Sequence, residues 1–450
     1  MNSAKVSIIM PSLNVADYIE ECLLSALNQT LQEIEIICID AKSTDGTWEL
    51  LKKYAENPKF KSKIRLLQSE IRSYGYQVNC GIKEARGKYI AILETDDYVH
   101  TEMYYDLYLL AEQNQVDFIK ADYDAFFQVP VVGDVYRRVA LWGHDKSFYN
   151  RVICPNRIGY LYSHDYSIWK GIYRKEFLIE NDICCNESKG AAFQDIGFAQ
   201  QVLACAKRAF YTDKSFYRYR MDRELSSVNS PNGLKFSYQE FNRLLNTPVL
   251  KNKLVYLDGL YEHMAHSFVG EYMKTLRITD YDMESEYIKP YYEWFHDMFM
   301  TAMEEDTFSF DRIKNLDIKN KLSLLLHNQR EFVEGIKEQE KQLDDREKEF
   351  LQLVSNKKVY IFGAGIKGQW TIERLLINGI IPVYACDNST KQQGTKILCV
   401  EVLSPEKCLE YYKKDTCDKV FVIANKFHYD EMEKQLVSNE ISKEEIIRSL

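Results

Sequence analysis

Short apolar runs and amphipathic segments alternate through the first hundred residues of the chain. Apolar residues recur at helical spacing in the segments between the runs, for example Ile19, Leu23 and Leu27 in the segment that the capping box Asp17-x-x-Glu20 opens. Strands that alternate with helices predict a parallel sheet covered by helices on both faces. The runs read as buried strands, each stopped by a proline or a polar residue, and cover residues 6–10, 34–39, 64–67 and 89–93.

The rest of the chain divides into further segments. Mixed helix and strand signals continue to about residue 225, and an aromatic-rich helical pattern and a charged helical stretch follow. A second alternation of strands and helices then begins at Lys357. Ile336, Leu343 and Phe350 lie seven residues apart in the charged stretch, so two roles stay open for it, a linker and a dimerisation element. The predicted domains are an α/β domain, a helical region, a helical linker and a small α/β domain, over residues 1–230, 231–328, 329–355 and 356–450.

Polar side chains follow three of the four predicted strands of the first domain. Asn14, Asp40 and the pair Asp96-Asp97 lie just beyond strand ends. The carboxyl ends of parallel strands meet at one edge of a sheet, which is where such sheets bind their ligands. Carboxylate oxygens suit Mg²⁺ or Mn²⁺ held against a diphosphate. The pattern favours a nucleotide site, although Asp97 as a simple helix N-cap is the alternative.

The order of these motifs resembles family 2 of the glycosyltransferases. The resemblance rests on VSIIMPSLN at residues 6–14, EIICID and STDGT within 35–47, NCG to ARGKYI within 79–90, and TDD at 95–97. It implies the GT-A fold, a metal-bound nucleotide-sugar donor and inversion at the anomeric carbon. It covers about half of the chain, because three later stretches are similar to bacterial members that build surface polysaccharides: IWKGIYRKEFL at 168–178, FQD at 193–195 and FYRYR at 216–220.

The resemblance implies a donor site at the ends of the strands. Pro11, Ser12 and Asn14 would line the nucleotide pocket. Asp40 would hydrogen-bond the base, usually uracil, and Asp96 would face the ribose or the metal.

The same resemblance implies a metal ion and a catalytic base. Asp97 would coordinate the metal on the diphosphate, and Asp195 falls where the family places the base that takes the acceptor's proton. The alternative for Asp195 is a first-turn acid favoured by the helix dipole. Gln194 replaces the usual Glu before it, and the missing like charge predicts a lower pKa for Asp195. For Arg218 and Arg220 two readings stay open, contact with the departing phosphates and a solvated face.

The aromatic helical region has three interpretations. A bundle packed on the first domain is favoured over an acceptor-glycan surface of Tyr and Trp faces and over a patch resting on a membrane. The membrane interpretation depends on basic residues around Leu322–Leu326: Lys314, Lys319, Lys321 and Arg330. Trp169 has two equally favoured interpretations, a core residue and a platform on which a sugar ring stacks. Scattered histidines are interpreted as ordinary surface or core residues: His144, His164, His263 and His266.

A glycine-rich loop opens the small C-terminal domain. Gly363, Gly365 and Gly368 match G-x-G-x-x-G after a predicted strand, and Asp387 follows some twenty residues on, which is the dinucleotide fingerprint. The domain has only about 94 residues, roughly half of a full dinucleotide-binding fold. It resembles the small Rossmann-like modules attached to bacterial sugar-modifying enzymes and transferases. A nucleotide or NAD(P) is its expected ligand, with a regulatory or oligomerising role favoured over a second enzyme.

Composition narrows the function classes and the location. The chain has 58 Lys and Arg against 67 Asp and Glu, a net charge of −9, which argues against a nucleic-acid binder. No apolar run approaches the ~20 residues that a membrane span needs. The eleven cysteines show no zinc-binding spacing and read as reduced thiols. A cytoplasmic protein is predicted, and a position at the inner face of the cytoplasmic membrane stays open.

The sequence therefore predicts an inverting, metal-dependent glycosyltransferase. It would move a sugar from a nucleotide sugar, with UDP favoured, to a hydroxyl of a capsular or lipopolysaccharide glycan, free or lipid-linked. Two alternatives stay open: a catalytically weakened nucleotide-sugar-binding or scaffold protein, and a bifunctional protein whose C-terminal domain uses NAD(P) in sugar modification. The oligomeric state is open as well, with a homo-oligomer as one alternative.

Overall fold

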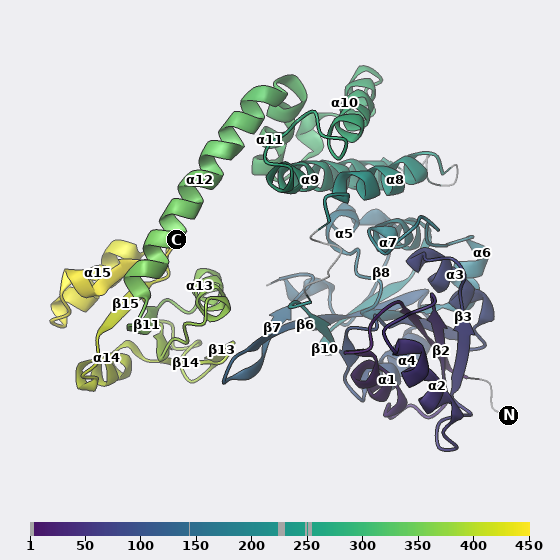
Figure 1. Ribbon diagram of the computed structural model, residues 1–450, viewed down its shortest axis with the longest axis horizontal. Coiled ribbons are helices and arrows are strands. Elements are labelled where there is room, and N and C mark those ends of the chain that lie inside the picture. Colours follow the sequence, from purple (N-terminus) through teal and green to yellow (C-terminus); the bar gives the residue numbers. More distant parts are fainter. Residues whose placement is uncertain (1–3, 144, 224–229, 248–249, 251–253) are drawn as a thin grey trace. The chain divides into compact units, whose positions relative to one another are not determined.

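The computed structural model describes residues 4–143, 145–223, 230–247, 250 and 254–450 (Figure 1). These residues form two compact units. The first consists of Met1–Ala125 and Arg138–Val333, and the second of Phe126–Arg137 and Glu334–Leu450. The aromatic helical region thus belongs to the same unit as the first α/β domain, whereas most of the charged helix belongs to the second unit.

The first unit is built on a mixed sheet with the strand order β3-β2-β1-β4-β9-β6-β10-β5. β1 to β4 are parallel, with Val6 of β1 opposite Ile34 of β2, whereas β9 runs antiparallel to both β4 and β6. β7 pairs with β6, and β8 pairs with β10. The strands are β1 (Val6–Ser12), β2 (Ile34–Asp40), β3 (Ile64–Gln68), β4 (Tyr89–Ile92), β5 (Tyr98–Val99), β6 (Phe118–Val129), β7 (Gly133–Val139), β8 (Val152–Ile153), β9 (Gly171–Arg174) and β10 (Ala209–Arg220).

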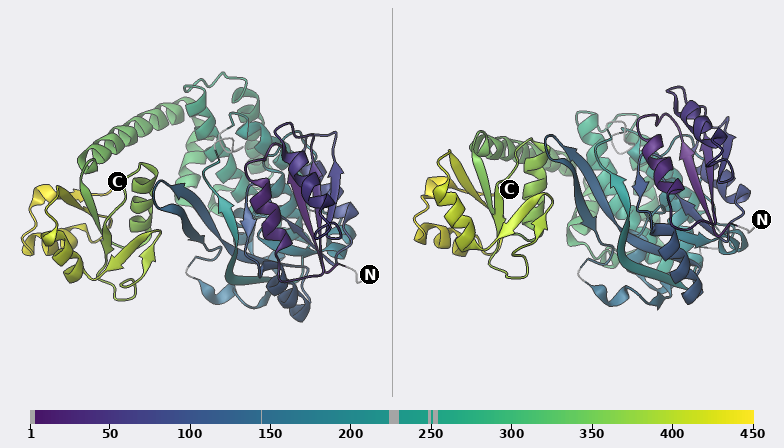
Figure 2. Two further views of the ribbon diagram at one scale, coloured as in Figure 1. Left: turned by 60° about the horizontal axis from the view of Figure 1, so that its bottom comes forward. Right: turned by 90° about the horizontal axis from the view of Figure 1, so that it is seen from below.

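Helices cover both faces of the parallel strands, as the alternating pattern predicts (Figure 2). Ile8 and Met10 of β1 share one core with α1, α2 and α4. Ile9 points to the other face and meets α3 at Gly81, where an added Cβ would lie 2.5 Å from the Ile9 Cγ2 atom. Glycine at this position therefore lets α3 approach the sheet closely. The helices of the α/β part are α1 (Ile19–Leu27), α2 (Thr47–Glu56), α3 (Tyr74–Glu84), α4 (Met103–Asn114), α5 (Gly159–His164), α6 (Lys175–Glu180) and α7 (Gln194–Cys205).

The region after residue 230 is a helical bundle whose core is aromatic. Phe268 stacks on Phe295 with ring centroids 4.6 Å apart, and Tyr272 meets the Phe268 ring edge-on at 6.0 Å. α8 contacts α7, and α9 contacts α5, so the bundle packs directly on the α/β part. No helix in the described part of the chain combines the length and the apolar character that crossing a bilayer requires. The bundle helices are α8 (Gly233–Leu245), α9 (Leu254–Ile278), α10 (Lys289–Glu304) and α11 (Leu316–His327).

The second unit contains a six-stranded sheet of order β13-β14-β12-β11-β15-β16, parallel except for β13. Its two cores lie on opposite faces, with Ile361 of β11 in one and Tyr360 in the other. Apolar side chains of the hairpin at 126–137 join the first of these cores, together with α12 and α13. The elements are α12 (Gln329–Val354), β11 (Lys358–Phe362), α13 (Ile366–Ile377), β12 (Tyr384–Cys386), β13 (Lys396–Ile397), β14 (Val400–Leu403), α14 (Pro405–Lys414), β15 (Lys419–Ile423), α15 (Tyr429–Ser438) and β16 (Ile446–Arg448).

Candidate functional site

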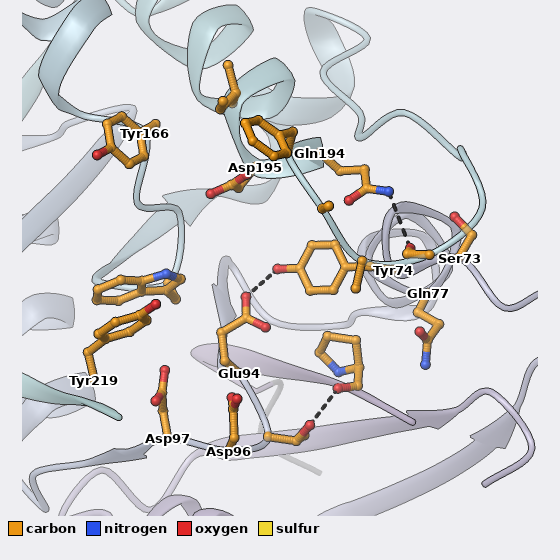
Figure 3. A pocket seen from close by; sticks show the side chains of 18 of the residues that line it. Ser73, Tyr74, Gln77, Glu94, Asp96, Asp97, Tyr166, Gln194, Asp195 and Tyr219 are labelled. Atoms are coloured by element: carbon orange, nitrogen blue, oxygen red, sulfur yellow. Dashed lines mark hydrogen bonds between the residues drawn. The ribbon is translucent and has the colours of Figure 1, made fainter. Parts of the chain in front are cut away.

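A cavity of about 830 Å³ lies at the carboxyl ends of β1 and β4. Pro11 and Ser12 reach it from the end of β1, and Glu94 and Asp96 from the segment that follows β4. Asp195, in the first turn of α7, lies across the cavity from these acids (Figure 3). The structure thus brings together residues that are as far as 184 positions apart in the chain.

The Asp97 carboxylate is fixed in place by hydrogen bonds from the last strand of the sheet. The Tyr217 hydroxyl donates to Oδ2 and the Arg220 backbone N–H donates to Oδ1, both at 2.8 Å. The Tyr217 oxygen also accepts the Glu94 backbone N–H at 3.2 Å. Only 2% of Asp97 is exposed. β10 therefore determines the orientation of this acid, and the pairing of β10 with β5 holds the whole segment.

Acidic side chains crowd together at this end of the cavity. Arg223 Nη1 donates to Asp96 Oδ2 at 2.7 Å, and the Tyr74 hydroxyl donates to Glu94 Oε1 at 2.5 Å. Burial raises the pKa of Glu94 to about 8, and the nearby carboxylates add to the rise. Burial and the Asp96 charge raise the pKa of Asp97 well above its ordinary value. A bound cation would relieve this crowding of acids. Among the described residues, however, no group of three or more His, Cys, Asp or Glu side chains is placed to hold a metal ion, so the aspartate pair would supply only part of a coordination shell.

Asp195 has a raised pKa, contrary to the sequence-based prediction. Loss of contact with bulk water raises its pKa to about 6, although backbone N–H groups at the start of α7 and the Lys120 ammonium oppose the rise. The prediction considered only the neighbour in sequence, and burial outweighs that effect. Gln194 is 1% exposed, and its amide donates to the Ser188 hydroxyl at 2.9 Å, so it holds the loop before α7.

Two predicted donor residues support the cavity without lining it in the described structure. Asn14 Oδ1 accepts the Thr44 N–H at 2.9 Å. Asp40 accepts the Ser43 N–H at 3.0 Å and the Ser43 hydroxyl at 2.5 Å. Both side chains brace the loop after β2, and their contacts with a nucleotide stay predictions. The sequence did not indicate Gln77, which lines the cavity.

The two arginines predicted near the phosphates are engaged in ion pairs. Arg218 pairs with Asp124, and Arg220 pairs with Glu21 at 2.9 Å. Neither is among the described residues that line the cavity, whereas Arg223 is. Phosphate contact stays a prediction for Arg218 and Arg220. Arg223 could have been noticed in the sequence as a third basic residue, just beyond the FYRYR stretch.

Aromatic and imidazole rings form the remaining walls. Trp169 lies parallel to the Tyr219 ring, 5.3 Å away at an angle of 9°, and both line the cavity. With 7% of its surface exposed, Trp169 serves as a core residue that also reaches the cavity. His144 lies outside the described residues. The other histidines that the sequence left as ordinary residues meet on the cavity wall, because α5 packs against α9: His164, His263 and His266.

The glycine-rich loop of the second unit adopts a tight conformation. Gly363 has φ 114°, and a Cβ at Gly368 would lie 2.0 Å from the Gly363 carbonyl oxygen. Gly365 directly precedes α13. Asp387 Oδ2 accepts the Ala364 N–H of this loop at 2.6 Å. Three basic residues gather near this loop: Lys367, Lys426 and Arg448. Burial and the two neighbouring cations lower the pKa of Lys367.

Comparisons with known proteins agree with this geometry. Residues 7–177 match the model described as Glycosyl transferase family 2. The uncharacterized glycosyltransferase YibD of Escherichia coli (strain K12) is 31% identical over 246 residues, which are 53% of this chain and 68% of YibD. The chain belongs to glycosyltransferase family 2. The uncharacterized glycosyltransferase EpsJ of Bacillus subtilis (strain 168) is also similar to this family 2 enzyme, at 31% identity over 48% of the chain and 60% of EpsJ.

The fold of this family 2 glycosyltransferase is found in a solved structure. Staphylococcus aureus TarS 1–349 in complex with UDP-GlcNAc superposes with a TM-score of 0.57 at 21% identity, over 75% of this chain and 92% of TarS 1–349. The predicted GT-A-like fold is confirmed. The family match ends at residue 177, so Asp195 and the bundle helix α9 lie beyond it.

Proposed function

We propose that this family 2 enzyme is an inverting, metal-dependent glycosyltransferase that extends a bacterial surface glycan from a nucleotide-sugar donor. The observation that carries the proposal is the placement of Asp195 opposite the Asp96-Asp97 pair in one cavity. A base on one side, and on the other a pair of acids that could hold a cation against the leaving diphosphate, are the two parts that a single displacement needs.

The donor would occupy the end of the cavity at β1 and β4. Pro11 and Ser12 would contact the nucleoside, and Arg223 lies beside the acids, where a diphosphate would be. Asn14 and Asp40 hold the adjoining loop and would shape the base site. UDP is the favoured carrier, with support from the family resemblance and from the UDP-GlcNAc bound to TarS.

Asp96 and Asp97 would hold the divalent cation, Mn²⁺ or Mg²⁺. Each Asp97 oxygen already accepts one hydrogen bond, whereas Asp96 is 22% exposed and has one oxygen bonded to Arg223, so Asp96 is the more available ligand. When bound, such a cation supplies charge neutralisation for a departing diphosphate. Tyr217 would keep the aspartate pair oriented through its hydroxyl.

Asp195 would act as the general base. With a pKa of about 6, it is mostly ionised at neutral pH and can accept the proton of an acceptor hydroxyl. The acceptor oxygen forms a bond to the anomeric carbon as the bond to the diphosphate oxygen breaks, and the proton passes to Asp195. Because the nucleophile arrives from the Asp195 side and the leaving group departs on the other, the anomeric carbon inverts.

The second unit is proposed to bind a nucleotide at its glycine-rich loop. The carboxyl edge of its sheet combines the start of α13 with Lys367, Lys426 and Arg448, which favours an anionic ligand. In NAD-binding folds the acid of the second strand contacts ribose, but here Asp387 accepts the Ala364 N–H. A regulatory nucleotide therefore fits better than NAD(P) redox chemistry. Stabilisation of the full chain by a nucleotide without metal, lost in Lys367→Ala but kept in Asp97→Ala, tests this assignment.

Thermal stabilisation tests the donor site. UDP, GDP and dTDP are each added with and without Mn²⁺ to the wild type, Asp96→Ala, Asp97→Ala and the control Asp311→Ala, whose side chain is 90% exposed. A ligand that binds the folded state raises stability by mass action. The proposal expects one nucleotide, UDP, to raise the melting temperature only with metal, in the wild type and the control but in neither cavity variant. Stabilisation by UDP that needs no metal and persists in Lys367→Ala, or no stabilisation at all, would contradict it.

A further inference from the structure

Helix α9 carries a polar stripe that faces the catalytic cavity instead of solvent. Its other sides are buried in the bundle, where Met264, Phe268 and Tyr272 are all fully enclosed. A polar face along a helix that is otherwise core is the face that can meet water or a ligand. The stripe consists of residues three or four apart that line the cavity: His263, His266, Ser267, Glu271 and Lys274.

Tyr166 connects the first residue of the stripe with the region of the proposed base. The Tyr166 ring lies 5.6 Å from the His263 ring, and Tyr166 is close enough to Asp195 to feel its charge. From His263 to Lys274 the helix rises roughly 16 Å at 1.5 Å per residue. An extended ligand with one end at Asp195 would therefore lie along several turns of α9.

The first groups of the stripe are uncharged hydrogen-bonding groups. His263 Nδ1 lies 2.9 Å from the Tyr162 carbonyl oxygen and 3.2 Å from the Gln200 side-chain amide nitrogen. Burial lowers the pKa of His263 to about 4 and also lowers that of His266, so both rings are neutral at pH 7. A neutral imidazole offers one donor and one acceptor nitrogen. Ser267 Oγ shares a hydrogen bond with Ser237 Oγ at 2.8 Å.

The charged side chains of the stripe lie only at its far end, where one positive and one negative group neutralise each other. Lys274 forms an ion pair with Glu271 one turn away. Neutral imidazoles, a hydroxyl and a compensated pair match the hydroxyl groups of uncharged sugars, which donate and accept in equal measure. They do not match a strongly anionic ligand, which would require uncompensated cations.

We propose that this face of α9 is the acceptor subsite of the enzyme and binds an uncharged oligosaccharide of at least two sugar rings. The inference rests on the proposed transferase function and adds the acceptor class to it. The subsite lies on α9, beyond residues 7–177, which are the part of the chain that matches the family model. His263, His266 and Lys274 would be specificity-determining residues, the first two for the ring next to the reacting hydroxyl and Lys274 for a more distant one.

Chain-length dependence of transfer tests the subsite. The probes are p-nitrophenyl glucoside, galactoside and N-acetylglucosaminide, and the matching cellobioside, lactoside and chitobioside, with the nucleotide sugar whose nucleotide stabilises the protein. In the wild type, the disaccharide should have a KM about tenfold lower than its monosaccharide. Lys274→Met should abolish that gain, and His266→Ala should raise KM for both lengths about three- to tenfold. His296→Ala, on α10 away from the cavity, is the matched control and should change neither value.

The outcomes distinguish failure of the proposed subsite from failure of the proposed transferase function. Nucleotide stabilisation should persist in His266→Ala and Lys274→Met, which also shows that the variants fold. Equal KM values for the two lengths in the wild type, or unchanged KM in both variants, would overturn the subsite while leaving the donor site intact. Transfer to none of the six glycosides, with nucleotide stabilisation retained, would overturn the uncharged acceptor. If no nucleotide stabilises the wild type, the result would instead count against the proposed transferase function.

Discussion

Replacement of the proposed base should make the protein less active but more stable. Removal from bulk water raises the pKa of Asp195 from 3.8 to about 6. Ionisation of this carboxyl therefore opposes folding above pH 6, because the unfolded chain ionises it more easily. The difference corresponds to about 3 kcal/mol at 1.36 kcal/mol per pKa unit. Water in the open cavity screens the charge, so about 1–3 kcal/mol is expected.

Asp195→Asn removes the charge and keeps an oxygen that can accept the N–H groups at the start of α7. Its free energy of unfolding should exceed that of the wild type by about 1–3 kcal/mol at pH 8. At pH 5 the folded wild type is largely protonated, and the excess should fall to about half. Urea unfolding in metal-free buffer, followed by tryptophan fluorescence at both pH values, measures this difference.

Two results would refute the reasoning. One is a variant that is less stable than the wild type at pH 8, and the other is a stability gain of the same size at pH 8 and pH 5. Asp311→Asn is the matched control, because its side chain is 90% exposed, and it should change stability by less than about 0.5 kcal/mol at either pH.

Three further substitutions test the surroundings of the site. Asp165→Asn should destabilise the protein by about 3–5 kcal/mol in urea unfolding, because the buried Lys120 ammonium, 3.0 Å away, loses its counter-charge; no loss would show that the pair is solvated. Gly171→Ala should cost about 1–3 kcal/mol in the same assay, since its Cβ would lie 2.2 Å from the Ile119 carbonyl oxygen, and a neutral effect would contradict that contact. Tyr217→Phe should weaken metal-dependent nucleotide binding about tenfold by calorimetry while the fold persists, and unchanged affinity would remove the tyrosine from the site.

The α/β part of the first unit could be predicted from the sequence because its strands are buried on both faces. Largely apolar runs such as Ile34–Ile39, in which Glu35 is the one charged residue, identify such strands without tertiary information, and the structure confirms this run as β2. Asp96 and Asp97 were predicted as site residues for the same reason, because they follow the end of a strand that the apolar pattern identifies. Asp195 was found only through the family resemblance, because its first-turn position alone fits an ordinary helix acid.

Other features depend on contacts between distant segments. The sequence does not indicate that His164 and His263 meet, because they lie on separate helices whose packing decides it. The pKa of Asp195 follows from burial by the whole cavity and could not be read from its neighbour Gln194. The hairpin at 126–137 joins the core of the second unit, although β6 begins and β7 ends among residues of the first. Such pairings leave no local pattern in the chain.

The most direct test of the proposed function is the release of nucleotide diphosphate from UDP-glucose, UDP-galactose and UDP-N-acetylglucosamine with Mn²⁺ and the glycoside acceptors. We expect the wild type to transfer one of these sugars with inversion, seen in the anomeric coupling by NMR. Asp195→Asn should lose about 10²- to 10⁴-fold in kcat while it still binds the nucleotide. Transfer with retention of configuration, or an Asp195→Asn variant as active as the wild type, would contradict the account.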